Sequence, residues 1–136
     1  MAGQFADADA EIRLEIGRDA GTVMAERYGL MQVFLNLAQN SLRAMSAAAE
    51  RVLTIRTSLE KERVVVRFLD TGPGVADPRH LFQPFQPGAH VTGLGLYVSR
   101  AMVRDFLGDL TFEPQKRGCC FAVGLVPAAV LEEVRA

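Results

Sequence analysis

The sequence is short of several residue types and patterns, and each shortage excludes a class of protein. No apolar run in the 136 residues approaches the ~20 that a membrane-spanning helix needs. The first nine residues lack the basic segment and apolar segment of a signal peptide. Fifteen basic and 16 acidic residues give a net charge of −1, too little for an overall grip on nucleic acid or an anionic membrane. We therefore expect a soluble, cytoplasmic domain.

Cysteine and lysine are equally scarce. The two cysteines, Cys119 and Cys120, are neighbours, so in a strand their side chains would point to opposite faces and could not join distant segments. Without a second pair or a histidine at zinc-finger spacing, they are predicted to be buried thiols that behave as small hydrophobic groups. The two lysines, Lys61 and Lys116, follow no glycine-rich loop, which excludes a Walker-type phosphate loop.

The apolar periodicity predicts strands and helices in interleaved order. Strands are expected over 11–16, 22–24, 51–59, 63–69, 110–113 and 119–126, and helices over 30–48 and 93–107. Residues 1–9 are expected to be a loose lead-in and 128–136 a tail, so that 1–136 is a single domain. This order predicts an α/β fold, a two-layer sandwich in which a mixed, mostly antiparallel sheet carries its helices on one face.

The first predicted helix has a polar stripe opposite a wide apolar face. The stripe contains Gln32, Asn36, Gln39, Asn40 and Arg43, within about 100° of one another by helical geometry. Solvated helix faces usually carry Glu and Lys, whereas two asparagines four residues apart are poor helix formers. The stripe therefore faces either solvent or a ligand cavity, where asparagine oxygens would suit a hard cation that already has phosphate ligands.

Two glycine-rich segments lie beside predicted elements. Asp70 to Gly74 follows a strand, and is either a capped turn or a site where the carboxylate accepts a hydrogen bond from an exocyclic amine such as that of adenine. Thr92 to Leu96 opens the second helix, where free backbone N–H groups suit phosphate. A lone Gly-x-Gly is weak evidence, and Val98 at the third glycine position excludes the dinucleotide-binding fingerprint.

Four segments in fixed order resemble the ATP-binding catalytic domain of sensor histidine kinases, in the superfamily shared with gyrase, heat-shock-90 chaperones and MutL-type ATPases. Residues 32–41, 70–74, 81–85 and 93–96 are similar to its N box, first glycine box, F box and second glycine box. The resemblance extends from residue 11 to 127 and implies the Bergerat-type ATP-binding fold. The run Asn-Leu-x-x-Asn-Ser-x-x-Ala-Met is most similar to the nitrogen-regulation and oxygen-sensing branch.

The resemblance implies roles for individual residues. Asn40 would coordinate the Mg²⁺ that accompanies ATP, Asn36 would lie one turn earlier in the same catalytic site, and Arg43 would contact phosphate. Asp70 would hydrogen-bond the adenine amine. The residues that it implies in nucleotide binding are Asp70, Gly72, Gly74, Val75, Phe85, Thr92, Gly93, Leu94, Gly95 and Leu96.

The lid implied between the F box and the second glycine box departs from the pattern of the family. Phe82 and Phe85 would anchor it, but the segment from Phe85 to Gly93 is short and contains no Lys or Arg. We expect a weak grip on phosphate, because His90 is a poor substitute for a permanent cation at pH 7.

The residue at position 36 bears on the reaction. Hydrolases and anti-sigma-type serine kinases of the superfamily carry Glu where Asn36 stands. Water and a serine hydroxyl benefit from a general base, and asparagine cannot accept a proton. A neutral imidazole already has a lone pair, so Asn36 favours a histidine acceptor.

The acceptor histidine is expected outside this sequence, because His80 and His90 fall in a Pro- and Gly-rich loop. We expect an ATP-dependent histidine protein kinase that phosphorylates a histidine-bearing dimerisation domain, in the same full-length protein or in trans. A response regulator would follow downstream, with no nucleic acid and no membrane contact from this segment. Two alternatives stay open: a non-catalytic nucleotide-binding or interaction module, and an anti-sigma-type serine kinase.

Overall fold

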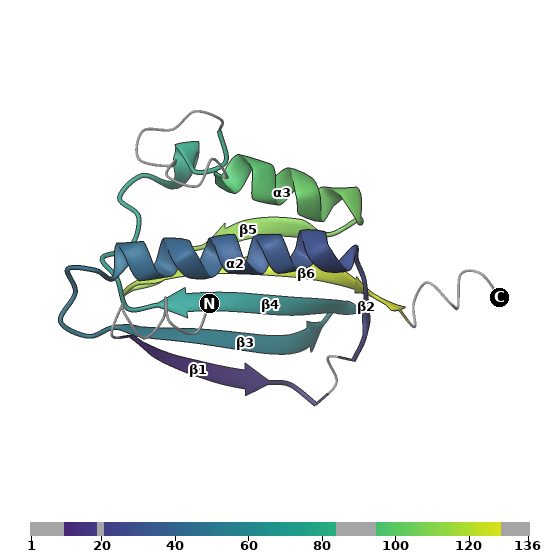
Figure 1. Ribbon diagram of the computed structural model, residues 1–136, viewed down its shortest axis with the longest axis horizontal. Helices are drawn as coiled ribbons and strands as arrows, with labels where there is room; N and C mark the ends of the chain where they lie inside the picture. Colours follow the sequence, from purple (N-terminus) through teal and green to yellow (C-terminus); the bar gives the residue numbers. More distant parts are fainter. Residues whose placement is uncertain (1–9, 19–20, 84–94, 129–136) are drawn as a thin grey trace.

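The computed structural model describes residues 10–18, 21–83 and 95–128, which form two layers (Figure 1). Helices α2 (Arg27–Ala44) and α3 (Leu96–Asp105) lie together on one face of a sheet. The strands are β1 (Glu11–Ile16), β2 (Val23–Met24), β3 (Val52–Glu60), β4 (Arg63–Asp70), β5 (Asp109–Glu113) and β6 (Cys119–Pro127), and a short 3-10 helix, η1 (Pro78–His80), precedes α3. The predicted α/β two-layer sandwich is confirmed.

The sheet is mixed, as its pairing shows. Its order is β1-β3-β4-β6, with β2 and β5 both paired to β6. Only β1 and β3 pair in parallel among the described strands, and the other pairs are antiparallel. The predicted hairpin joins β3 to β4 through Lys61 and Glu62, whose φ angles of 50° and 64° match the twist that a two-residue hairpin turn needs. Asp70 thus ends a central strand, opposite Leu53 on β3 and Cys119 on β6.

Helix α2 begins three residues before the predicted start and ends four residues before the predicted end. The Glu26 side chain is its N-cap and accepts the backbone N–H groups of Tyr28 and Gly29. Because N-caps are usually Ser, Thr, Asp or Asn, the sequence contains little sign of a helix that starts before a glycine. At the other end the N–H of Met45 donates to Ser41 and the helix stops.

Helix α3 begins after Gly95, which is its N-cap, so it starts three residues after the predicted start at residue 93 and ends two residues before the predicted end at 107. Its last turn is closed by N–H groups of Leu107 and Gly108, which donate to the carbonyls of Arg104 and Val103. Leu107, with φ 65°, takes the left-handed position that glycine usually fills. Gly108 is needed for another reason: a Cβ there would lie 2.4 Å from the carbonyl oxygen of Gly124 on β6.

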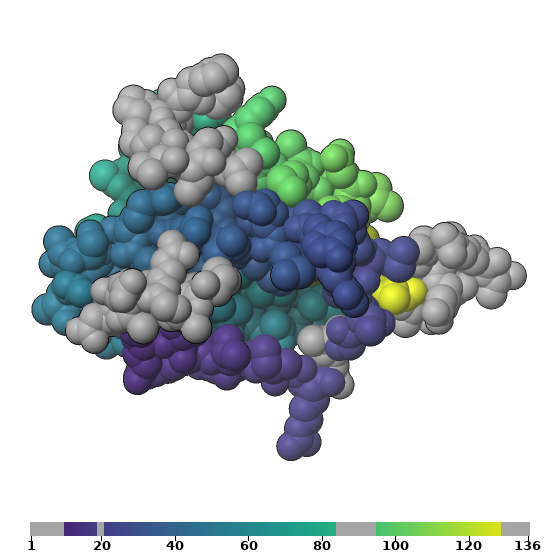
Figure 2. All heavy atoms as spheres, viewed as in Figure 1, coloured from purple at the N-terminus to yellow at the C-terminus, as the bar shows by residue number. Residues whose placement is uncertain are grey.

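The core lies between the helices and the sheet. Figure 2 shows α2 and α3 side by side over the sheet, with β1 along its margin. Cys119 and Cys120 are free and buried, as predicted, and burial raises the pKa of each thiol to about 12. In the described part of the chain, no helix is long and apolar enough to cross a membrane. The largest fully buried apolar side chains are Phe68, Leu37, Met45, Leu53, Leu110, Leu125, Val33, Val103 and Val123.

Candidate functional site

Asp70 is a buried carboxylate held by several donors. It is 7% exposed and accepts the N–H of Gly72 at 3.0 Å, the Ser41 side chain and the backbone of Cys119. Burial raises its pKa above the usual 3.8, and these three hydrogen bonds oppose the rise. The donors come from α2, β6 and the loop after β4, so the orientation of the carboxylate is fixed by three separate segments.

The loop after Asp70 approaches its neighbours too closely for most side chains. A Cβ on Gly72 would lie 3.1 Å from the carbonyl oxygen of Ala44 at the end of α2. Gly74 has φ +82°, and its Cβ would lie 2.8 Å from the carbonyl oxygen of Gly118. Val75, the next residue, packs against the core and is partly buried. The predicted first glycine box is therefore a close-packed loop at the carboxyl end of α2.

Gly118 is a residue of the site that the sequence motifs did not indicate. Its φ is +76°, and a Cβ there would lie 1.9 Å from the carbonyl oxygen of Asp70. A glycine between the polar turn of Lys116 and Arg117 and a buried strand was the available signal. Gly118 lets the start of β6 pass directly against the backbone of Asp70, the residue whose carboxylate is predicted to bind adenine.

The two asparagines of α2 differ in their surroundings. Asn36 is 1% exposed, and its Nδ2 donates to the Ser99 hydroxyl on α3 at 2.8 Å. Its Oδ1 has no hydrogen-bond partner among the described residues, a state that costs about 1–3 kcal/mol for a buried polar group. Asn40 is half-buried, and its Oδ1 accepts a hydrogen bond from the exposed Arg43 guanidinium.

Neither alternative predicted for the polar stripe of α2, facing solvent or facing a ligand cavity, describes all of its residues. Gln32 and Arg43 are exposed, Gln39 and Asn40 are intermediate, and Asn36 is enclosed between the helices. The exposure of the side chains thus decreases across the stripe, from the exposed Gln32 and Arg43 to the buried Asn36.

The described part of the F box packs onto the core through Phe82. Its ring meets the Phe121 ring edge to face, with 6.3 Å between centroids. The Arg100 guanidinium of α3 lies over the Phe82 ring, with Cζ 4.4 Å from the centroid, a contact that the sequence did not indicate. His80 is exposed and is hydrogen-bonded to Gln83. The predicted lid residue Phe85 lies outside the described residues.

The second glycine box is described only in its last residues. Gly95 and Leu96 form the start of α3, and the carbonyl of Gly95 accepts the N–H groups of Val98 and Ser99. The backbone N–H groups that come before Val98 in the sequence have no partner within the helix, and they point outward from its start. Thr92, Gly93 and Leu94, also predicted to bind nucleotide, lie outside the described residues.

These segments meet at one end of the molecule. The contact of Ser41 with Asp70 joins α2 to the end of β4, and the contact of Asn36 with Ser99 joins α2 to α3 one turn after its start. Figure 1 shows the carboxyl end of α2, the end of β4 and the beginning of α3 on the same side. The described residues of the predicted N box and of both predicted glycine boxes thus lie at the same end of the molecule.

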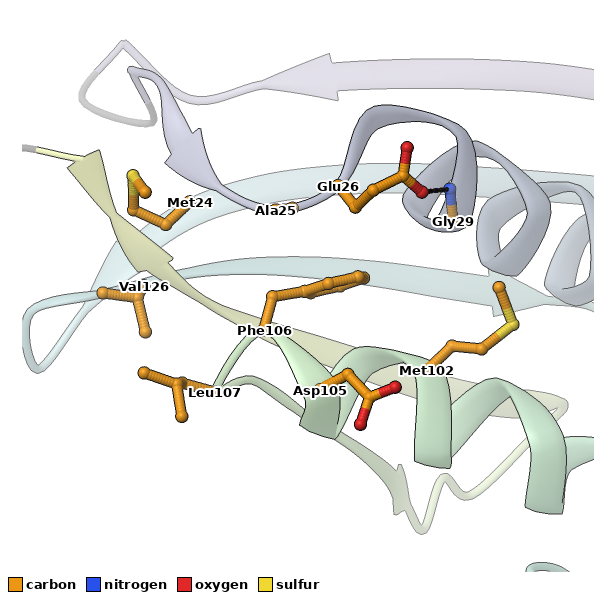
Figure 3. Close-up of a pocket in the computed structure, with 9 residues that line it drawn as sticks. All are labelled: Met24, Ala25, Glu26, Gly29, Met102, Asp105, Phe106, Leu107 and Val126. Atoms are coloured by element: carbon orange, nitrogen blue, oxygen red, sulfur yellow. Dashed lines mark hydrogen bonds between the residues drawn. The ribbon is translucent and has the colours of Figure 1, made fainter.

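A cavity of about 550 Å³ lies at the opposite end, between the start of α2 and the end of α3 (Figure 3). Its surface is mostly apolar, and it contains none of the predicted site residues. Its lining consists of Met24, Ala25, Glu26, Gly29, Met102, Asp105, Phe106, Leu107 and Val126.

The donor set at the candidate site fits a magnesium–phosphate complex better than a metal held by protein alone. Over residues 10–18, 21–83 and 95–128, no cluster of three His, Cys, Asp or Glu side chains could hold a metal ion. The site instead has two amide oxygens one helical turn apart, and that of Asn36 has no partner among these residues. Neutral oxygens of this kind suit Mg²⁺ that keeps phosphate and water as its other ligands.

Comparisons with known proteins agree with this geometry. Residues 25–129 match the family described as histidine kinase-, DNA gyrase B-, and HSP90-like ATPase. The chain is 33% identical over 131 residues to the C4-dicarboxylate transport sensor protein DctB of Rhizobium meliloti (strain 1021), covering 94% of this chain and 21% of that protein.

Solved structures have the same fold. The nucleotide-free catalytic domain of histidine kinase ThkA matches with a TM-score of 0.78 at 24% identity, over 91% of this chain and 84% of that one. ThkA in complex with response regulator protein TrrA matches with a TM-score of 0.72 at 24% identity, over 91% of this chain and 36% of that one.

The chain therefore belongs to the histidine kinase-, DNA gyrase B- and HSP90-like ATPase family. Within that family, it is an ATP-binding catalytic domain of the sensor histidine kinase type. It spans about a fifth of the length of DctB, with 21% covered.

Proposed function

We propose that this domain transfers the γ-phosphoryl group of ATP to a histidine on a helical dimerisation domain. In this proposal Asp70 accepts a hydrogen bond from the adenine amine, and the start of α3 at Gly95 receives the phosphates. Asn40 and Asn36 present oxygens to the phosphate end of the nucleotide. When bound, Mg²⁺ would neutralise part of the phosphate charge that phosphoryl transfer must disperse.

One observation carries the choice of acceptor. Asn36 is buried between α2 and α3, and it is a neutral amide that cannot remove a proton from water or from a serine hydroxyl. A neutral imidazole needs no such base, because its lone pair is already free to attack phosphorus. The site therefore favours histidine over hydrolysis or serine phosphorylation.

Arg43 has two roles in the proposal. Its guanidinium now donates to the Asn40 oxygen that would face the metal, so it must release that oxygen when Mg²⁺ and phosphate bind. Once released, it is a permanent cation at the exposed edge of the site. It would then bind phosphate where the predicted lid offers neither Lys nor Arg.

The proposal extends to partners that the chain does not include. The phosphoacceptor would be a helical domain in the same longer protein or in trans, and a response regulator would then receive the phosphoryl group, as the complex of ThkA with TrrA suggests for a related kinase. We place the domain in the cytoplasm, with 1–136 as one catalytic unit and no direct contact with nucleic acid or membrane. The nitrogen-regulation and oxygen-sensing branch stays a prediction.

The test uses γ-labelled ATP with the chain alone and with the helical phosphoacceptor domain of its own kinase. We expect label to appear on the acceptor histidine only when both are present, and phosphate release by the chain alone to stay near the uncatalysed level. Asn40→Ala should abolish transfer, whereas Gln32→Ala, on the exposed side of the same helix, should not change it. Steady phosphate release by the chain alone that is lost in Asn36→Ala would overturn the assignment.

A further inference from the structure

We infer that Ser99 is a positioning residue, which acts through Asn36 on the phosphate end of the nucleotide site. The inference rests on the proposed function, because it takes the phosphates to lie between Asn40 and the start of α3. Its basis is the hydrogen bond of 2.8 Å from Asn36 Nδ2 to the Ser99 hydroxyl. This hydrogen bond joins the side chains of α2 and α3 directly, across 63 residues of sequence.

The surroundings of this pair are apolar. Val33 and Leu37 on α2 and Val103 on α3 are almost completely buried near it, and Asn36 and Ser99 are only 1% and 2% exposed. Two apolar residues of similar shape would serve an interface between helices at least as well, because a neutral hydrogen-bonded pair adds little over an apolar one. Helix packing therefore gives no reason for an asparagine and a serine here.

The position of the pair supplies a reason. Asn36 precedes Asn40 by four residues, and Ser99 follows Gly95 by four residues, so each lies one helical turn behind a residue proposed to face the phosphates. The hydrogen bond therefore fixes the spacing between α2 and α3 at a level one helical turn away from Asn40 and from Gly95. A shift of either helix would change both halves of the phosphate site together.

The direction of the hydrogen bond adds a second consequence. In this arrangement Nδ2 donates to the Ser99 hydroxyl, and Oδ1 has no partner within the described residues. A buried acceptor left open in this way is commonly paired by a water or a ligand donor. Without Ser99 the Asn36 amide would lose the hydrogen bond that fixes its position beside α3.

The test compares the affinity for the non-hydrolysable ATP analogue AMPPNP in Mg²⁺ and in EDTA, by calorimetry on the whole chain. The ratio of the two affinities measures the phosphate end of the site. For Ser99→Ala we expect this ratio to fall about five- to tenfold, the loss of roughly one hydrogen bond, while the affinity in EDTA stays within about twofold. Equal losses in both conditions, or no loss in either, would overturn the inference.

Ser41→Ala is the matched control. Ser41 is also a buried serine of the same layer, 3% exposed, but it is bonded to Asp70 at the adenine end. We expect Ser41→Ala to weaken AMPPNP equally in Mg²⁺ and in EDTA, so that its ratio is unchanged. A ratio that falls as much in Ser41→Ala as in Ser99→Ala would assign the effect to general loosening of the fold.

A double variant separates positioning from packing. If Ser99 acts only through Asn36, then Asn36→Ala with Ser99→Ala should have the same Mg²⁺ ratio as Asn36→Ala alone. Additive losses would show an independent effect of Ser99 and contradict the inference. Failure of the proposed function gives a different result. If the wild-type chain binds AMPPNP more tightly in Mg²⁺ than in EDTA yet never labels its phosphoacceptor domain, the kinase assignment is wrong. The role of Ser99 is then still decided by the affinity ratios of the variants.

Discussion

Replacing Gly118 with alanine would disturb the point at which β6 supports Asp70. The new Cβ would lie 1.9 Å from the carbonyl oxygen of Asp70, well inside any possible contact, and the backbone there has φ +76°. An L-residue in the left-handed region costs about 1–2 kcal/mol. Forcing the overlapping backbone apart adds about 1–3 kcal/mol. We therefore expect the free energy of unfolding to fall by about 2–5 kcal/mol.

The same strand provides a control for this substitution. Gly124, further along β6, has nothing within 4 Å of the position that an alanine methyl group would take and no left-handed φ, so alanine should fit. Gly124→Ala should leave stability unchanged or raise it by about 0.5–1 kcal/mol, because glycine is unfavourable inside a strand.

Urea unfolding followed by circular dichroism measures both variants. The midpoint should fall for Gly118→Ala and not for Gly124→Ala, with the slope unchanged in each. Thermal unfolding should give a melting temperature lower by about 3–5 °C for each kcal/mol lost. An unfolding free energy for Gly118→Ala within about 0.5 kcal/mol of that for Gly124→Ala would refute the reasoning.

Four further predictions concern Asp70, Glu60 and the two cysteines. Asp70→Asn should lower ADP affinity by about 1–3 kcal/mol and narrow the preference for ADP over GDP in calorimetry, and an unchanged preference would remove the adenine role. Burial raises the Asp70 pKa above its usual value of 3.8. As the pH falls toward this raised pKa and the carboxylate is protonated, ADP affinity should also decline. Hydrogen bonds from Arg67 lower the Glu60 pKa from 4.5 to about 2, so the stability that Glu60 contributes is present above pH 4.5 and is lost as the pH falls toward 2. In Glu60→Gln, the free energy of unfolding should therefore depend less on pH between 4.5 and 2. The same pH dependence in the variant and the wild type would contradict this. Cys119 and Cys120, with pKa values of about 12, should react with a thiol reagent at pH 8 only on unfolding, and rapid labelling of the native chain would be evidence against their burial.

The strands were predictable from local pattern: charged and apolar residues alternate along β1, and β4 and β6 are short, nearly continuous apolar runs. The predicted limits of the first strand, 11–16, are those of β1, and the hairpin around Lys61 and Glu62 is where a polar turn separates two apolar runs. The start of α2 was wrong by three residues, because a glutamate serves as its cap and Gly29 lies in its first turn. Periodicity alone carries no information about a side chain that folds back onto the backbone.

Some residues of the candidate site were predictable from the local sequence, and others depend on contacts between distant segments. Asp70, Gly72 and Gly74 belong to one short motif, and the structure brings them together at the end of β4. Ser99 and Gly118 were not identified as site residues, because their importance depends on partners 63 and 48 residues away in the chain and the turn before β6 marks Gly118 only as a glycine at a strand start. Close approach between distant segments is a property of the folded sheet and helices, and no spacing within one segment encodes it.

The directions of the strands also decide where attached segments join the domain. Glu11 pairs with Val52 at the beginnings of β1 and β3, which is the end of the sheet where β4 finishes at Asp70. Strand β6 starts at that end and runs nine residues to Pro127, a length of about 30 Å at strand rise. In the proposed function, a phosphoacceptor domain joined before β1 would therefore be attached at the same end of the sheet as Asp70. A fluorescent reporter joined after residue 127 would instead stand a strand's length away, and could follow the kinase without obstructing its substrate.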